Sequence, residues 1–326
     1  MVSTVVPLFV FSLPRSGSTL IQRILAAHES IATVSESHIL LPYLYTLRDK
    51  GVYSEYYHKY TVRGIQAFCL ELPNGVEDYL AEIRTLILRL YTKAADSNAK
   101  YFLDKAGAYH LIVNDIIRLF PEGKFIFLWR NPLAVVSSLM ESWRNGRWNL
   151  YEHEVYLYDG AHQLVAAYEK YRARVCAVRF EDLIINPNAE CRRILGYLEL
   201  PFDPEILSKF SEIQLRGELG DRPGMRQYQH LSREPLYKWK RVLANPIRKA
   251  WCKRYLQYIG KERLAVMGYD IAELLGELNS IPLSLFFLGS DILRIPYGLA
   301  FRLMEGRIMK DKLQAILAGQ RVYLHH

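Results

Sequence analysis

A short polar segment near the N-terminus combines an arginine, a glycine and several hydroxyl side chains. It reads Pro14-Arg15-Ser16-Gly17-Ser18-Thr19, follows an apolar run that ends at Leu13, and precedes apolar residues at helical spacing. Backbone N–H groups in the first turn of a helix have no intrahelical acceptor and readily bind anions. Arg15 and the hydroxyl groups offer further donors to a phosphate. The segment therefore predicts an anion site at a turn between a strand and a helix.

The segment differs from the P-loop of ATP- and GTP-binding proteins at its diagnostic position. A P-loop reads Gly-x-x-x-x-Gly-Lys-Ser/Thr, and alignment on Gly17 puts Ser12 in place of the first glycine and Ser18 in place of the lysine. One alternative interpretation is a P-loop-like nucleotide kinase that depends on Mg²⁺, although Ser18 stands where such a kinase has its lysine. An ordinary turn that binds no ligand is the other.

Basic residues follow four of the apolar runs that we predict to be strands. The runs occupy residues 8–13, 31–34, 101–103, 124–129 and 175–178, with helical patterns between them. The basic residues are Arg15, Lys105, Arg130 and Arg179. Short apolar strands that alternate with helices indicate an α/β fold of three layers, α/β/α, with a central parallel sheet. Because ligands bind at the carboxyl ends of such strands, we expect the four cations to share one anion site.

These motifs resemble those of the sulfotransferases that use 3′-phosphoadenosine 5′-phosphosulfate (PAPS). Their 5′-phosphosulfate loop reads Pro-Lys/Arg-Ser/Ala-Gly-Ser/Thr-Thr, which residues 14–19 match position by position. Their 3′-phosphate motif has an arginine, then Asn/Asp-Pro, and a serine eight residues after the arginine, as in Arg130-Asn131-Pro132 and Ser138. The arginine at position 15, where the soluble small-molecule enzymes have a lysine, resembles the branch that acts on protein tyrosines and a related set of bacterial enzymes. The resemblance covers about residues 5–270 and implies a P-loop NTPase-like sulfotransferase fold.

The resemblance also implies catalytic roles. Glu36 stands where the tyrosylprotein branch has its general base, and Arg15 and Lys105 match the cations that stabilise charge on the sulfonate and the bridging oxygen. In the soluble small-molecule branch a histidine follows the lysine closely, and that spacing is absent here. His38 and His110 are kept as secondary candidates.

The residues implied in cofactor binding lie in three parts of the chain. They are Arg15, Ser16, Gly17, Ser18, Thr19, Leu20, Arg130, Ser138, Arg179 and Lys238. Lys238 precedes a tryptophan, and a cofactor-closing loop is expected at residues 220–226. Phe180-Glu181-Asp182-Leu183 is similar to the family's Tyr-Glu-Asp/Gln-Leu segment, so the Phe180 ring is expected to pack on adenine. No metal is expected.

Composition narrows the class of partner. The chain of 326 residues carries a formal net charge of +8 and has a pI near 9.1, which favours an anionic ligand, an acidic acceptor, nucleic acid or an anionic membrane. From the motifs we expect PAPS as cofactor and a saccharide, a tyrosine or a small molecule as the hydroxyl-bearing acceptor, and no nucleic acid. Four widely spaced cysteines and the absence of a signal-peptide pattern lead us to expect a cytoplasmic protein with reduced thiols.

The family resemblance ends near residue 270, so the C-terminal part of the chain is considered separately. We expect residues 1–275 to form the sulfotransferase domain and residues 276–326 to form a helical C-terminal extension. The extension combines apolar residues with Arg302, Lys310 and Lys312. Docking on its own domain, docking on a second copy in a homodimer, and contact with an anionic membrane as an amphipathic helix are all open interpretations.

The sequence as a whole predicts a sulfotransferase that moves the sulfuryl group of PAPS to an acceptor hydroxyl group. Besides the kinase, the alternative is a catalytically inactive nucleotide- or membrane-binding protein with the same fold. That alternative predicts that Glu36→Gln changes nothing measurable.

Overall fold

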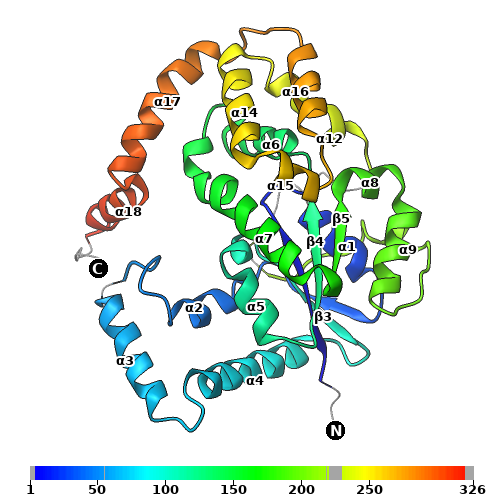
Figure 1. Ribbon diagram of the computed structural model, residues 1–326, viewed down its shortest axis with the longest axis vertical. Coiled ribbons are helices and arrows are strands. Elements are labelled where there is room, and N and C mark those ends of the chain that lie inside the picture. Colours follow the sequence, from blue (N-terminus) through cyan, green and yellow to red (C-terminus); the bar gives the residue numbers. More distant parts are fainter. Residues whose placement is uncertain (1–3, 55, 218, 220–229, 320–326) are drawn as a thin grey trace.

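A five-stranded parallel sheet forms the centre of the described part of the chain. The computed structural model describes residues 4–54, 56–217, 219 and 230–319 (Figure 1). The strands are β1 Val6–Ser12, β2 Ile31–Thr33, β3 Tyr101–Asp104, β4 Lys124–Trp129 and β5 Val175–Arg179. Their order is β2-β3-β1-β4-β5, and every neighbouring pair is parallel. The expected strands and the parallel sheet are confirmed, and the carboxyl ends of the strands meet at one edge.

Helices cover both faces of this sheet, and further helices lie outside these layers (Figure 1). In the first half of the chain they are α1 Ser18–Ala26, α2 Leu40–Tyr45, α3 His58–Leu70, α4 Val76–Ala94, α5 Val113–Leu119, α6 Pro132–Arg144 and α7 Ala161–Tyr171. In the second half they are α8 Phe180–Ile185, α9 Pro187–Tyr197, α10 Ile206–Lys209, α12 Glu234–Tyr237, α13 Trp239–Val242, α14 Pro246–Ile259, α15 Lys261–Val266, α16 Ile271–Ser280, α17 Leu288–Leu303 and α18 Gly306–Leu317.

Side chains of β1 alternate between two hydrophobic cores, one on each face of the sheet. Phe9 and Phe11 pack into a core that α4, α5, α6 and α7 complete, whereas Leu8 and Val10 pack into a second core with α1, α8 and α9. Since successive residues of a strand point to opposite faces, a strand that is apolar throughout needs helices on both sides. The predicted three-layer α/β/α architecture is therefore confirmed.

The helical segment between β4 and β5 that ends in α7 is not α-helical throughout. A π-helical segment, Val155–Gly160, precedes α7. At Gly160 a Cβ atom would lie 2.9 Å from Leu13 Cδ2 and 3.0 Å from His110 Cδ2. The helix thus passes very close to the end of β1, and π-helical turns in other proteins often lie near functional sites.

The expected boundary after residue 275 lies inside a helix. Leu274 and Leu278, both in α16, belong to the core, as does Ile281. After α16 the chain continues as α17 and α18, which run along the outside of the molecule (Figure 1). Among the described residues, no helix combines the length and apolar character needed to cross a bilayer.

Candidate functional site

The turn between β1 and α1 has an unusual backbone that depends on a glycine. Arg15 and Gly17 both have positive φ angles, +67° and +92°. A Cβ atom at Gly17 would lie 2.3 Å from Cδ2 of Phe180, so only glycine fits this turn. The α1 helix begins directly afterwards, at Ser18. The first N–H groups of α1 therefore lie at the carboxyl end of the central strand, where an anion site was predicted.

Side chains connect this turn to the start of α6. Arg15 Nε donates to Ser138 Oγ at 3.2 Å, and Arg130 Nη1 donates to the backbone oxygen of Arg15 at 2.6 Å. The Arg130 guanidinium also lies over the Phe180 ring, 4.5 Å from its centroid. The two anion motifs, 115 residues apart in the chain, are thus joined into one site.

A hollow of about 390 Å³ collects four of the predicted cofactor residues. Arg15, Arg130, Ser138 and Lys238 all line it. Lys238 Nζ lies 3.4 Å from Glu141 Oε2, another lining residue. A concentration of cations and hydroxyl groups in one hollow is the donor set that a phosphate group requires.

The start of α6 is held by residues whose role the sequence did not reveal. Asn131 is the N-cap of α6: its Oδ1 accepts a hydrogen bond from the N–H of Leu133 at 2.9 Å. Glu181 Oε1 accepts from the N–H of Asn131 at 2.9 Å, and Glu181 Oε2 accepts from the Tyr269 hydroxyl at 2.6 Å. Burial raises the pKa of Tyr269 well above its usual value, so its hydroxyl stays protonated and donates. Glu181 and Tyr269 therefore fix the turn that carries Arg130.

Glu36 and Lys105, the predicted base and its partner cation, form an ion pair. Lys105 Nζ donates to Glu36 Oε1 at 2.7 Å and lies 3.5 Å from Thr19 Oγ1, while His38 Nε2 lies 3.4 Å from Glu36 Oε2. Burial alone would raise the pKa of Glu36. The hydrogen bond from His38 and the charge of Lys105 outweigh burial and lower this pKa to about 2. Glu36 is therefore ionised, as a general base must be.

A buried carboxylate that sequence reasoning passed over supports this pair. Asp104 is fully buried and accepts hydrogen bonds from the hydroxyls of Tyr91, Tyr109 and Ser37 at 2.5, 2.7 and 2.9 Å. Burial raises the pKa of Asp104, and these hydrogen bonds lower it. Ser37 and Asp104 are the chain neighbours of the two paired residues. The network thus ties the loop after β2 to the end of β3.

The structure keeps three other expected residues out of the hollow. Arg179 lies over the Tyr269 ring at 4.7 Å, and its Nη1 lies 3.8 Å from Asp182 Oδ2. His110 is buried, its Nδ1 donates to the backbone oxygen of Gly107, and burial lowers its pKa. Phe180 is fully buried against Gly17 and Arg130, so the expectation that it packs on adenine is wrong.

Most of the predicted residues in the β1–α1 turn are buried. Ser16, Thr19 and Leu20 are buried, so Leu20 can reach a ligand only through its backbone. The expected closing loop at 220–226 lies outside the described residues. In the described ranges, no cluster of three or more His, Cys, Asp or Glu side chains could hold a metal ion.

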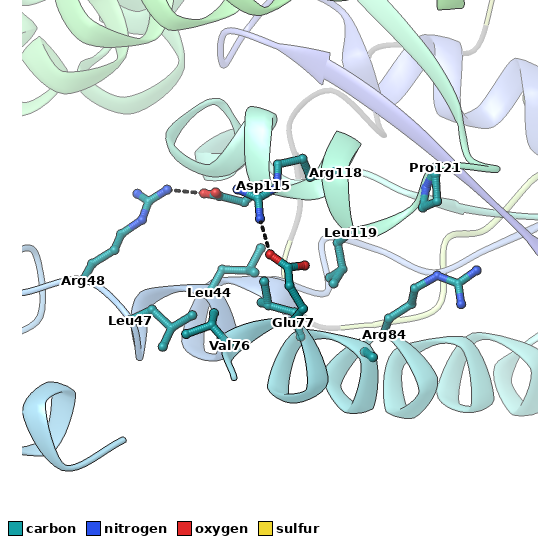
Figure 2. Close-up of a pocket in the computed structure, with 12 residues that line it drawn as sticks. Leu44, Leu47, Arg48, Val76, Glu77, Arg84, Asp115, Arg118, Leu119 and Pro121 are labelled. Carbon is teal, nitrogen blue, oxygen red and sulfur yellow. Dashed lines mark hydrogen bonds and ion pairs between the residues drawn. The ribbon is translucent and has the colours of Figure 1, made fainter. Parts of the chain in front are cut away.

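A second hollow, of about 600 Å³, lies between α2, α4 and α5 and is separate from the cation site. Its wall is largely apolar, and ion pairs cross it between Arg48 and Asp115 and between Arg118 and Glu77 (Figure 2). None of the predicted site residues lines it.

Comparison with known families finds a match over most of the sheet. A family model described as "Sulfotransferase family" matches residues 7–204, more than half of the chain. The matched range contains every predicted site residue except Lys238.

Individual relatives match over part of their length. The protein-tyrosine sulfotransferase of Drosophila melanogaster is 26% identical over 208 residues, which cover 61% of this chain and 39% of that protein. Protein-tyrosine sulfotransferase A of Caenorhabditis elegans is 24% identical over 206 residues, which cover 61% of this chain and 51% of that protein. The chain thus spans about half the length, or less, of these relatives.

A solved structure shares the fold. The sulfotransferase domain from the curacin biosynthetic pathway aligns with a TM-score of 0.51 and 22% identity, covering 73% of this chain and 91% of that domain.

Proposed function

Because this chain belongs to the sulfotransferase family, we propose that it transfers the sulfuryl group of PAPS to an acceptor hydroxyl group. The observation that supports this proposal most directly is the joining of two anion-binding turns by the hydrogen bond from Arg130 to the backbone of Arg15. PAPS carries a 5′-phosphosulfate and a 3′-phosphate, so its binding site needs two such turns on one surface.

The donor set fits this cofactor. The β1–α1 turn offers backbone N–H groups and hydroxyls, and the hollow beside it adds Arg130, Ser138 and Lys238. When bound, PAPS supplies an activated sulfuryl group attached to phosphate through a bridging oxygen. We assign the 5′ end to the β1–α1 turn, next to Lys105, and the 3′-phosphate to Arg130 and Ser138.

The reacting groups lie on the other side of the β1–α1 turn. Glu36 accepts the proton of the acceptor hydroxyl as the oxygen of that hydroxyl forms its bond to sulfur. Lys105 and Arg15 stabilise the negative charge that collects as the bond between sulfur and the bridging oxygen breaks. The proton ends on Glu36, and the electron pair of the broken bond remains on the phosphate oxygen.

The ion pair between Lys105 and Glu36 has a consequence for the strength of the base. An anion bound beside Lys105 competes with Glu36 for the same ammonium group. When Lys105 turns to that anion, burial raises the pKa of Glu36 with less opposition. Glu36 then becomes a stronger base when the sulfuryl donor is in place.

We propose a tyrosine, a saccharide or a small molecule as the source of the hydroxyl. The two relatives named as protein-tyrosine sulfotransferases favour tyrosine as the first acceptor to test. Sulfate transfer from radiolabelled PAPS to a tyrosine peptide and to oligosaccharides compares these classes directly.

The decisive experiment is calorimetric titration of 3′-phosphoadenosine 5′-phosphate, the product nucleotide, in the presence of EDTA. We expect tight binding by the wild type, about tenfold weaker binding by Ser138→Ala, and a loss of about 100-fold or more when Arg130→Ala is added. Arg118→Ala, in the separate hollow, is the matched control and should bind like the wild type. No binding, or binding of ATP with Mg²⁺ instead, would contradict the proposal.

Glu36→Gln separates a transferase from an inactive nucleotide-binding protein. This variant should keep its affinity for the nucleotide and lose at least about 100-fold in the transfer rate, because only the proton acceptor has changed. An unchanged transfer rate would remove Glu36 from the mechanism.

A further inference from the structure

The last two helices expose an unusual number of large apolar side chains. Each of the following is more than half exposed: Ile292, Leu293, Tyr297, Leu299, Leu303, Met309, Leu313, Ile316 and Leu317. Single exposed apolar residues are common, whereas a contiguous group marks a surface that contacts an apolar partner. We call the apolar side of α17 and α18 that these residues form the α17–α18 face.

In most surface helices the apolar side faces the protein and the polar side faces the solvent. In α17 this arrangement is reversed. Its polar side chains face the protein: Asp291 is fully buried against Arg248, Arg294 Nε donates to the backbone oxygen of Trp148 at 2.7 Å, and Arg302 bonds to Glu154 at 2.8 Å. The opposite side of the helix carries exposed apolar residues. These are Ile292, Leu293, Pro296, Leu299, Ala300 and Leu303. The polar contacts of α17 therefore hold an apolar stripe outward.

α18 carries an apolar stripe of its own, with positive charge at its borders. Met309, Leu313, Ile316 and Leu317 share one side of the helix at a repeat of about 3.6 residues. At the same repeat, Lys310 and Lys312 flank this stripe on its two sides, whereas Asp311 lies opposite. Apolar residues bordered by lysines are the pattern of a helix that lies in the interface of an anionic bilayer.

We propose that the α17–α18 face rests on a lipid bilayer that contains anionic headgroups. The leucines and isoleucines enter the boundary of the acyl chains, and the lysines extend to the headgroups. A two-fold dimer through the same face is less favourable, because it would bring the lysine borders of two copies together.

The neighbouring segment before α3 suits the same surface. Its Tyr53 hydroxyl bonds to Glu305 Oε1 at 3.4 Å, and Tyr53 and Tyr56 are exposed, as is Tyr60 in the first turn of α3.

Flotation of the full chain with lipid vesicles tests this proposal. We expect the wild type to bind vesicles of phosphatidylcholine with phosphatidylglycerol, and to bind phosphatidylcholine alone more weakly. Leu313→Ser combined with Leu317→Ser should weaken binding to both vesicles by on the order of tenfold or more, since apolar area is lost. Lys310→Gln combined with Lys312→Gln should weaken binding only to the anionic vesicles.

The matched control is Gln314→Ser, which changes an exposed polar residue of the same helix outside the apolar stripe and should float like the wild type. All the substituted side chains in this test lie on the outer helix α18, away from the core, so unfolding temperatures should stay unchanged. Failure of the wild type to bind anionic vesicles would overturn the proposal. So would a leucine variant that floats normally, or one whose only effect in light scattering is to convert a dimer to a monomer.

Discussion

The ionisation of Glu36 is controlled by a histidine two residues along the chain and by a lysine at the end of the neighbouring strand. Burial would raise the pKa of Glu36, yet His38 and Lys105 lower it from 4.5 to about 2. The folded state gains stability from this lowered pKa above pH 4.5, and the gain is lost as the pH falls toward 2. Throughout the neutral range Glu36 is therefore ready to accept a proton.

We expect His38→Ala to raise the pKa of Glu36, because burial would then be opposed by Lys105 alone. His38→Gln retains an N–H donor and should leave the pKa of Glu36 at about 2. Carboxyl ¹³C chemical shifts measured against pH report this value directly, with Glu36→Gln identifying the resonance. Identical titration curves for His38→Ala and the wild type would show that the histidine does not control the base.

At the scale of elements, the site depends on how closely the β1–α1 turn approaches α8. Gly17 combines a positive φ angle with a Phe180 ring that leaves no room for a Cβ atom. The same ring supports the guanidinium of Arg130. One contact between two elements thus sets the geometry of both anion-binding turns.

Gly17→Ala should lower the free energy of unfolding by about 1–3 kcal/mol and weaken nucleotide binding, because the Phe180 ring must shift and the backbone is strained. Gly64→Ala is the matched control: it lies inside α3 with nothing within 4 Å, and it should raise the free energy of unfolding by about 0.5–1 kcal/mol. Chemical denaturation and calorimetry measure both effects. Equal behaviour of the two variants would mean that the turn tolerates a side chain.

The strands and the positions of their carboxyl ends could be predicted from the sequence, because residues close together in the chain determine both. Apolar runs marked the strands, and the basic residues after them marked the edge where Arg15, Lys105 and Arg130 lie. The supporting residues left no such pattern. Glu181 contacts a residue 50 positions earlier and another 88 positions later, and Asp104 accepts from a serine 67 positions earlier. Such contacts depend on how helices and strands pack, which periodicity does not reveal.

At the scale of the whole molecule, the C-terminal segment is fastened to the core by a buried ion pair. Arg248 on α14 donates from Nε to Asp291 Oδ2 at 2.7 Å and from Nη2 to Asp291 Oδ1 at 2.9 Å, and both side chains are fully buried. Asn245 also donates to Asp291, at 3.0 Å. The same contacts turn the apolar stripe of α17 outward. The contacts of Asp291 therefore both dock α17 on the core and leave its apolar side exposed.

Asp291→Ala should lower the free energy of unfolding by about 3–5 kcal/mol, because it leaves the guanidinium of Arg248 buried without its carboxylate. Asp311→Ala, an exposed acid on α18, is the matched control and should change it by less than about 0.5 kcal/mol. Denaturation followed by fluorescence of the core tryptophans is the measurement. If α17 and α18 were a separate unit, the core transition of Asp291→Ala would stay in place and a second, earlier transition would appear. A single transition shifted to lower denaturant would instead mean that the core and α17 unfold together.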